Sequence, residues 1–193
     1  MNHLHPFDAT RPRPPHFLFP PLPPSERLRY DPLSAENARE VWRLFRDDTN
    51  PHVIPEYKEE ADFMGYTHFH LNHVRLSPKR AGHDWLLRVG NACVGLLNLY
   101  GLSKERFGEA QLPPPACVGF SVGPTYRRRG FAREAVCRVV PYVFQHFDVP
   151  AVRAFTEPKN VASQKLLCDC GFRPLPDEEG SRYCYFEVLR DEG

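Results

Sequence analysis

The sequence predicts an α/β domain that follows a proline-rich arm. Beyond about residue 26, patterns typical of strands and helices follow in the order strand, two helices, three strands, helix, strand, helix, strand. The chain of 193 residues, 41% hydrophobic and 25% charged, has the size and composition of one globular domain with its own core. Prolines recur throughout residues 1–25. We therefore divide the chain into an arm, residues 1–25, and a domain, residues 26–193.

The arm is expected to be extended, because its prolines exclude a helix and a central strand. It is either disordered or laid across the domain. The segment His16–Phe19 is apolar enough to dock on its own domain or on a second copy of the chain. An SH3-type ligand is the alternative interpretation of the arm.

The first half of the domain starts with a strand over Arg27–Leu33. Ser34 is a candidate N-cap for a helix that runs to about Phe45. A second helical pattern covers residues 58–74, and two strands, residues 85–89 and 92–100, flank a two-residue hairpin turn at Gly90–Asn91.

The second half starts with a strand at Ala116–Val122, after a proline-rich loop. The helix after Gly130 places apolar residues on one face, and Pro141 inside it should kink or break it. Its apolar positions are Ala132, Val136, Val139, Val140, Val143 and Phe147. Then come a strand at Val152–Thr156, a helix at Asn160–Cys170 closed by Gly171, and a last strand at Tyr183–Leu189.

The stretch Val118–Val136 carries the strongest functional signal. A strand ends at Gly123–Pro124, and the chain then passes through Arg127–Ala132 into a helix. The first backbone N–H groups of a helix lack partners and lie at the positive end of its dipole, so this turn suits phosphate. Gly130 allows close approach of a ligand, and arginines add charge-assisted hydrogen bonds. We expect a ligand with a pyrophosphate here.

Composition excludes several partners. The net charge of +1 argues against nucleic acid, and no apolar run is long enough to span a membrane. The six cysteines are scattered, which favours buried free thiols in a reducing, cytoplasmic setting. They are Cys93, Cys117, Cys137, Cys168, Cys170 and Cys184.

Two blocks of the chain carry recognisable motifs. The first, Arg127-x-x-Gly130-x-Ala132, resembles the [Q/R]-x-x-G-x-[G/A] pattern of the GCN5-related N-acetyltransferase (GNAT) superfamily. The second block is similar to the RimJ/RimL-like branch, some members of which acetylate the N-termini of ribosomal proteins. It comprises Glu157-Pro158-Lys159-Asn160-Val161-Ala162-Ser163, Leu167 and Gly171-Phe172.

The resemblance implies a mixed, mostly antiparallel sheet, flanked by helices and splayed between its fourth and fifth strands, with acetyl-CoA in the opening. The fourth strand is Ala116–Val122 and the fifth is Val152–Thr156. Backbone groups of Phe120, Ser121 and Val122 would pair with the pantetheine arm, and Asn160 would bond the pantetheine or nearby backbone. The pyrophosphate would lie on Arg127, Arg128, Arg129, Gly130, Phe131 and Ala132.

The same resemblance implies direct attack of an amine on the thioester, which needs a route for the proton and a donor to the oxyanion. A backbone N–H near Val122 is a candidate oxyanion donor. Relatives often carry a glutamate base where this chain has Cys117, so the base is absent or comes from elsewhere. Ser163 matches a serine that some relatives use as the acid, and it is equally suited to bonding a backbone carbonyl. Leu167 replaces an acid tyrosine.

The base remains open among residues that spacing does not fix. They are Glu109, Glu157, His68, His70 and His73. We expect no metal, because His68 would point away from the other two histidines on a regular helix. The histidines are better explained as a solvated helix face near the acceptor.

The predicted function is N-acetyl transfer from acetyl-CoA to a primary amine, either a protein N-terminus or a small molecule. The loop Ser103–Pro115 should contribute to the acceptor wall. One alternative is a non-catalytic acyl-CoA-binding module, which Cys117 permits. Another is an interaction protein that works through its proline-rich arm. The family leaves monomer and homodimer open.

Overall fold

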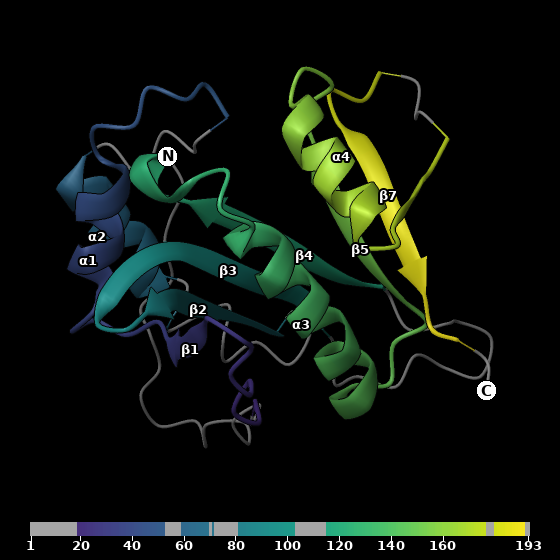
Figure 1. Ribbon diagram of the computed structural model, residues 1–193, viewed down its shortest axis with the longest axis horizontal. Coiled ribbons are helices and arrows are strands. Elements are labelled where there is room, and N and C mark those ends of the chain that lie inside the picture. Colours follow the sequence, from purple (N-terminus) through teal and green to yellow (C-terminus); the bar gives the residue numbers. More distant parts are fainter. Residues whose placement is uncertain are drawn as a thin grey trace, which may run out of the picture.

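A seven-stranded sheet with the strand order β1-β2-β3-β4-β5-β7-β6 organises the molecule (Figure 1). The computed structural model describes residues 19–52, 59–69, 71, 81–102, 115–176 and 180–191. The strands are β1 (Arg29–Pro32), β2 (Ala81–Val89), β3 (Ala92–Leu102), β4 (Ala116–Val122), β5 (Ala151–Thr156), β6 (Arg173–Pro174) and β7 (Cys184–Leu189). The helices are α1 (Ala38–Phe45), α2 (Glu60–Phe69), the 3₁₀ turn η3 (Pro124–Tyr126), α3 (Phe131–His146) and α4 (Val161–Asp169).

The sheet is antiparallel except between its fourth and fifth strands. The parallel pairing of β4 and β5 consists of two residue pairs, Ala116 with Val152 and Cys117 with Arg153. Beyond them the two strands diverge, so the sheet opens into a V (Figure 1). This confirms the mixed, splayed α/β fold expected from the sequence.

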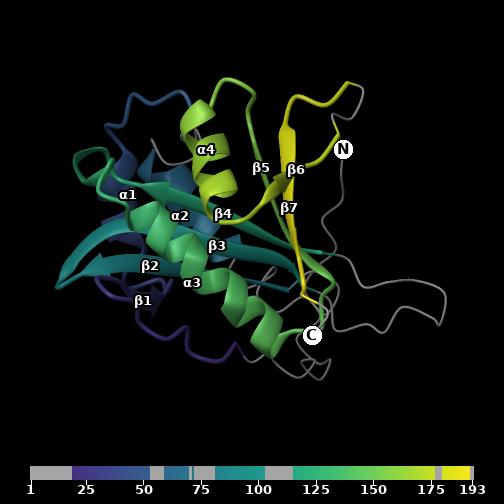
Figure 2. The ribbon, with the colours of Figure 1, turned by 45° about the vertical axis from the view of Figure 1, so that its right-hand side comes forward.

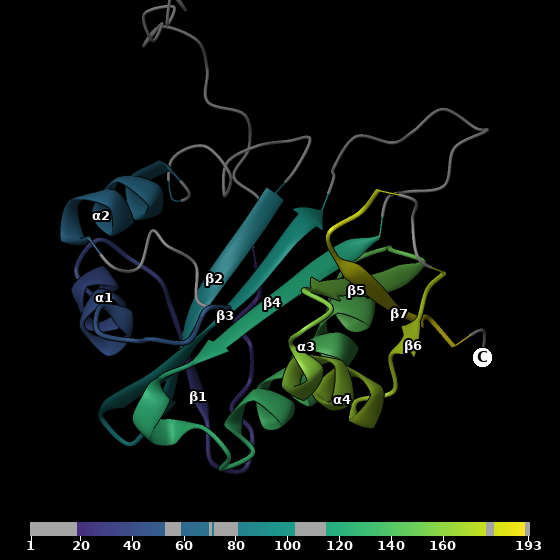
Figure 3. The ribbon, with the colours of Figure 1, turned by 90° about the horizontal axis from the view of Figure 1, so that it is seen from above.

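Helices cover both faces of the sheet. Leu86 and Leu96 pack with Phe45 of α1, whereas Trp85 and Leu97 belong to the core that includes α3. Neighbouring residues of β2 and β3 therefore enter different cores, as the two-residue period of a strand requires. Figure 3 shows α1 and α2 on one side of the sheet and α3 and α4 on the other.

The start of α1 differs from the sequence prediction. Ser34 was expected to cap this helix, but the helix begins at Ala38, after a turn. The side chain of Asn37 accepts a hydrogen bond from Ser34 N at 2.8 Å, and Ala38 N donates to Ser34 O at 3.0 Å. These two hydrogen bonds close a turn over Ser34–Ala38, and the helix begins only after it.

Other boundaries shift in the same way. Helix α2 spans Glu60–Phe69, and residues 58, 70 and 72–74 of its expected range lie outside the described residues. Strand β2 begins at Ala81 rather than Trp85. The short strand β6 was not predicted, because two residues carry no periodic pattern. Pro141 does not break α3, which continues to His146. The last helix starts and stops as predicted, with Asn160 as its N-cap and Gly171 in the left-handed conformation at φ 87°.

None of the six cysteines is fully buried, contrary to expectation. All six are free; Cys137 and Cys168 are exposed, and the other four are half-buried. Cys137 occupies the outer face of α3, and its Sγ lies 3.3 Å from the Sγ of Cys170 just after α4. The spacing of apolar residues in the sequence does not distinguish the buried face of a helix from the edge of that face. Cys137 was therefore expected to be buried although it is exposed.

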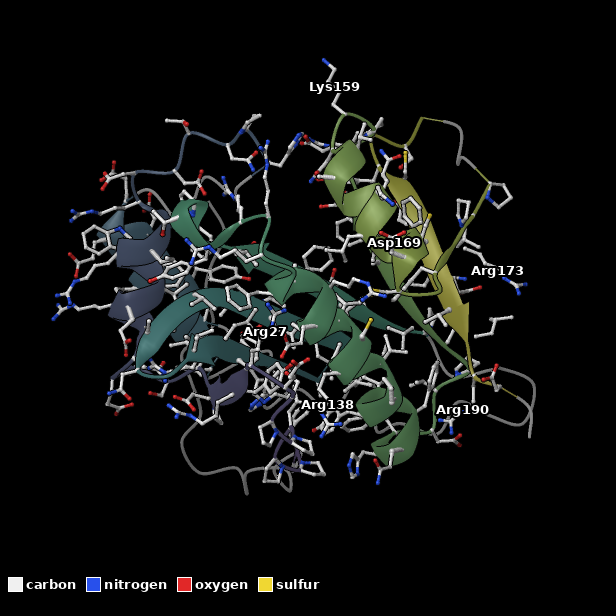
Figure 4. All side chains as sticks on the ribbon, viewed as in Figure 1. Arg27, Arg138, Lys159, Asp169, Arg173 and Arg190 are labelled. Carbon is white, nitrogen blue, oxygen red and sulfur yellow. The ribbon has the colours of Figure 1, made fainter. Side chains whose placement is uncertain are left out.

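The last part of the proline-rich arm lies along α3. Leu22 is buried in the main core, and Phe19 packs against it. The hydroxyl of Tyr142 donates to Pro20 O at 2.7 Å, and Arg138 Nε donates to Pro23 O at 3.0 Å. Figure 4 shows Arg138 on this helix and Arg27 nearer its start. Residues 19–25 are thus laid across the domain, and residues 1–18 lie outside the described residues.

Glu134 of α3 fixes the junction between arm and domain. Its carboxylate accepts hydrogen bonds from Ser25 Oγ at 2.6 Å, Arg27 N at 2.7 Å, Arg27 Nε at 2.8 Å and Leu28 N at 3.1 Å. Partial burial pushes the pKa of Glu134 upward, but the hydrogen bonds from Ser25 and Arg27 outweigh it and hold this pKa below its ordinary value. The junction is therefore built around an ionised carboxylate.

We predict that Glu134→Gln lowers the free energy of unfolding by about 2 kcal/mol at pH 7, because it weakens charge-assisted hydrogen bonds. The pKa of Glu134 is lower in the folded protein than the unfolded value of 4.5. Ionised Glu134 therefore stabilises the fold fully above pH 4.5, and this stabilisation is lost as the pH falls through the folded pKa. The difference from wild type should therefore shrink below about pH 4. Urea unfolding at several pH values measures this, and a constant difference would contradict it.

Candidate functional site

A cavity of about 530 Å³ occupies the opening between β4 and β5. Helix α4 runs beside β5 at this opening (Figure 2). The cavity wall comes from the strands, from α2 and α4, and from the segment after α1. Its lining residues are Pro51, His52, Tyr66, Gly82, Asp84, Asn98, Leu99, Tyr100, Val118, Gly119, Phe120, Ser121, Ala154, Phe155, Thr156, Glu157, Asn160, Ser163, Leu167 and Tyr183.

The second half of β4 offers one strand edge to the cavity. Phe120, Ser121 and Val122 pair with β3 on one side. Their other edge faces the divergent β5, whose pairing with β4 ends at Cys117. Backbone N–H and C=O groups on such an edge suit a ligand that adds as an extra strand.

The turn after β4 leads into an open helix start. Gly130 adopts a left-handed conformation, φ 81°, and the start of α3 has no side-chain cap. The first backbone hydrogen bond of the helix is from Glu134 N to Gly130 O. The N–H groups of Phe131, Ala132 and Arg133 therefore have no acceptor within the helix, as expected of a first turn. This geometry suits an anion.

The three arginines of this turn have different environments. Arg127 Nε donates to Val122 O at 3.0 Å, and both terminal nitrogens of Arg127 bind the buried carboxylate of Asp48. Arg128 is exposed and has a positive φ of 60°, and the guanidinium of the exposed Arg129 lies over the Tyr126 ring. Arg127 therefore holds the turn in place, whereas Arg128 and Arg129 present charge to the surface.

A short segment after α1, Asp48–His52, bridges the open end of the V, and we call it the strap. Asp48 Oδ1 accepts from Asn50 N, and Asn50 Oδ1 accepts from His52 N, both at 3.0 Å. His52 Nδ1 lies 2.7 Å from Glu157 Oε2, at the end of β5. Since Asp48 binds Arg127, just past the end of β4, the strap connects the two separated strand ends.

The start of α4 forms the opposite wall of the cavity. Asn160 Oδ1 accepts a hydrogen bond from Ser163 N at 3.2 Å, so the asparagine caps the helix. Asn160 and Ser163 both line the cavity, and the buried Leu167 follows one turn later. The asparagine thus bonds nearby backbone, one of the two roles expected for it.

Cys117 stands at the position where relatives often have a glutamate. Burial raises the pKa of its thiol, and the nearby Arg153 only partly opposes this. Cys117 pairs with Tyr100 on the neighbouring strand β3, and burial also raises the pKa of Tyr100. Both groups are therefore protonated at neutral pH, and neither accepts a proton readily.

Sequence reasoning missed several polar residues of the cavity, among them Asp84, Asn98 and His52. Asn98 interrupts the otherwise apolar strand β3, and that interruption was the available signal. Asp84 gave no such signal, because it precedes the strand expected from the sequence at residues 85–89. His52 has no signal beyond its place after Asn50–Pro51. Of the candidate bases, Glu157 lines the cavity and His68 is exposed on α2. Glu109, His70, His73 and residues 103–114 of the expected acceptor loop lie outside the described residues.

In the described ranges, no helix is long and apolar enough to cross a membrane.

We predict that Asp48→Asn lowers the free energy of unfolding by about 2 kcal/mol, because Arg127 loses its charged partner. The double variant with Arg127→Ala should lose less than the sum of the single changes, since both remove the same pair. Chemical denaturation of the four proteins measures the coupling. Additive losses would show that the pair does not hold the strap.

Comparison with known proteins gives a consistent result. The profile of the acetyltransferase (GNAT) domain matches residues 27–173. The chain is 24% identical over 116 residues to YnaD of Bacillus subtilis, an uncharacterized N-acetyltransferase; the match covers 55% of this chain and 63% of YnaD. The chain thus aligns with less than two thirds of that relative.

Two solved structures share the fold. RimL, a ribosomal L7/L12 alpha-N-protein acetyltransferase in complex with coenzyme A, has a TM-score of 0.66 at 10% identity, with 87% of this chain and 97% of RimL covered. A chimera of the spermidine N-acetyltransferase SpeG from Vibrio cholerae with hSSAT has a TM-score of 0.61 at 15% identity, with 85% of this chain and 96% of the chimera covered.

Proposed function

Because this chain belongs to the acetyltransferase (GNAT) family, we propose that it transfers an acetyl group from acetyl-CoA to a primary amine in a ternary complex. The observation that carries the proposal is the V between β4 and β5, with an open strand edge on one wall and an open helix start at its end. RimL and SpeG, which share the fold, are named for a protein amine and a polyamine acceptor. Either type of amine is a candidate here, and the cytoplasm is the expected location.

We place the donor in the opening by matching its two ends to the groups described above. The pantetheine arm would lie along Phe120–Val122 as an added strand, facing Asn160 and Ser163 on α4. The pyrophosphate would then meet the first turn of α3, at residues 127–132. Arg128 and Arg129 would add charge from outside, and Arg127 would hold the turn through Asp48.

The chemistry follows from this placement. The amine nitrogen forms a bond to the acetyl carbon, the carbon–sulfur bond breaks, and the amine gives up a proton. A backbone N–H near Val122 would stabilise the oxyanion. The leaving thiolate takes a proton, for which Ser163 is the candidate donor because it lines the cavity on α4. No metal is required.

A non-catalytic acyl-CoA-binding module is the second candidate. It is favoured by Cys117, a protonated thiol at the position where relatives often have a base. The two functions differ in one measurement. The enzyme releases the free thiol of CoA when amines are added to acetyl-CoA, whereas the module binds acetyl-CoA and releases none.

We predict that acetyl-CoA raises the melting temperature of the protein. The double variant Arg128→Ala/Arg129→Ala should bind acetyl-CoA at least about tenfold more weakly, since each arginine contributes a charge-assisted contact. Acetyl-pantetheine, which lacks the pyrophosphate, should bind both proteins equally. Arg43→Ala, which removes an exposed charge from α1, is the matched control. Absence of any acetyl-CoA effect on wild type would contradict both candidate functions.

We predict that Ser163→Ala lowers kcat about tenfold with little change in the KM for acetyl-CoA, because a thiolate needs only modest acid assistance. Its melting temperature should stay close to wild type, because the cap from Asn160 uses the backbone of Ser163. Steady-state kinetics and thermal unfolding test this. A kcat within twofold of wild type would assign Ser163 a structural role.

A further inference from the structure

A histidine and a carboxylate meet at the open end of the cavity. His52 Nδ1, at the end of the strap, lies 2.7 Å from Glu157 Oε2, and both residues line the cavity. We propose that His52 is the general base that takes the proton from the acceptor amine, and that Glu157 positions its ring. This inference rests on the proposed function of the same cavity, and it assigns the base that Cys117 does not provide.

The contact with Glu157 determines which ring nitrogen of His52 is basic. A carboxylate oxygen accepts a hydrogen bond but does not donate one, so Nδ1 of His52 carries the hydrogen in this contact. The lone pair of the neutral imidazole is then on Nε2. The ring therefore binds the protein through one nitrogen and can accept a proton on the other.

The strap holds the imidazole at the cavity wall. The backbone N of His52 donates to Asn50 Oδ1 at 3.0 Å, and the ring is bound by Glu157. The start of the strap is fixed in turn, because Asp48 binds Arg127. The side chain of His52 is 20% exposed, so most of its surface lies against protein. A base that is already oriented loses little freedom when it takes up the proton.

The register of the sheet brings this pair level with the donor edge of β4. The last residues that pair between β4 and β5 are Cys117 and Arg153. Continued along both strands, this parallel register brings Ser121 level with Glu157. Ser121 lies in the middle of the strand edge on which we place the pantetheine arm, and it lines the same cavity. His52, bound to Glu157, therefore stands across the opening from the place expected for the thioester.

The other titratable groups of the cavity are less well placed for this role. Asp84 is on β2, so β3 lies between it and β4, and its carboxylate accepts a hydrogen bond from Asn98 at 2.6 Å. Tyr100 is protonated at neutral pH, because burial raises its pKa. Around His52, the titratable residues of the described cavity lining are Glu157, Asp84, Tyr66, Tyr100 and Tyr183, and the strap adds Asp48 with its partner Arg127.

His52 and Ser163 then divide the proton transfers between them. One proton of the ammonium group passes to Nε2 of His52, and the lone pair that it leaves on nitrogen attacks the acetyl carbon. As the carbon–sulfur bond breaks, the nitrogen loses a second proton, which offsets the one that the thiolate takes up through Ser163. The imidazolium, held by the carboxylate of Glu157, returns its proton to solvent. One proton is released for each acetyl group transferred.

The test uses n-hexylamine, which carries a proton at neutral pH. His52→Asn is expected to lower kcat/KM for this amine about 100-fold at pH 7, the size of a general-base contribution. The loss should shrink to about tenfold or less at pH 9, because a larger fraction of the amine then arrives without its proton. The KM for acetyl-CoA should stay unaltered. His146→Asn, the same change at an exposed position of α3, is the control and should resemble wild type. Equal losses at both pH values, or no loss, would overturn the inference.

The asparagine variant separates the chemistry of His52 from its place in the strap. The amide nitrogen of asparagine replaces Nδ1 and still donates to Glu157, so the melting temperature should stay close to wild type. O-hexylhydroxylamine has the same chain length, and its amine is uncharged at neutral pH, so it needs no base before it attacks. Its kcat/KM should change less than threefold in His52→Asn. A similar loss for both acceptors would assign His52 a structural role and overturn the inference.

Glu157→Gln covers the case in which His52→Asn does not fold. It keeps an oxygen that accepts from Nδ1 of His52, and it removes the charge that holds the imidazolium. It should lower kcat for n-hexylamine about tenfold at pH 7 and leave the KM for acetyl-CoA unaltered. A kcat within twofold of wild type in the folded variant would overturn the inference.

The inference and the proposed function fail in different ways. Wild type that binds acetyl-CoA and releases no CoA thiol with either acceptor is the acyl-CoA-binding module, and the inference is overturned together with the enzyme function. Wild type that acetylates n-hexylamine no faster than His52→Asn remains an enzyme, and the inference alone is overturned.

Discussion

The early separation of β4 from β5 is the constraint on which the rest of the site depends. The two strands share two residue pairs, and beyond them β5 no longer pairs with the facing edge of β4. Unpaired edges are costly when buried and prone to aggregation when exposed. In this fold the edge faces a cavity. The start of α3 lies at one end of the opening, and α4 forms the opposite wall. A ligand with a peptide-like arm and a charged end matches all three features.

The strap connects the two strand ends where the sheet is open. Its first residue, Asp48, binds Arg127 after β4, and its last residue, His52, binds Glu157 after β5. The contact of the strap with Arg127 gives the first arginine of the motif a structural role. The charge of this arginine is already neutralised, so the attraction for an anion falls to Arg128, Arg129 and the backbone.

The sequence allowed accurate prediction wherever local chemistry decides the conformation. The strand Ala116–Val122 and the helix between Asn160 and Gly171 were placed well, because a strand pattern, an N-cap and a C-cap act over a few residues. Ser34 was assigned the wrong role because the side chain of Asn37 binds Ser34 N and closes a turn before the helix. The Arg127–Asp48 pair could not be foreseen, since its members are 79 residues apart and nothing local links them. The place of Asp84 in the cavity wall could not be foreseen either, because it depends on how β2 lies in the sheet.

The attachment of the arm to α3 has a consequence for the order of folding. Arg27 and Glu134 are 107 residues apart in the chain, and the contact of Tyr142 with Pro20 spans 122. During synthesis Phe19 and Leu22 emerge from the ribosome long before the helix that covers them. Until that helix is made, these apolar side chains are exposed to solvent. The prolines around them cannot pair inside a sheet, so they keep this segment from adding as a strand to other chains. The proline-rich composition therefore serves the nascent chain as well as the finished fold.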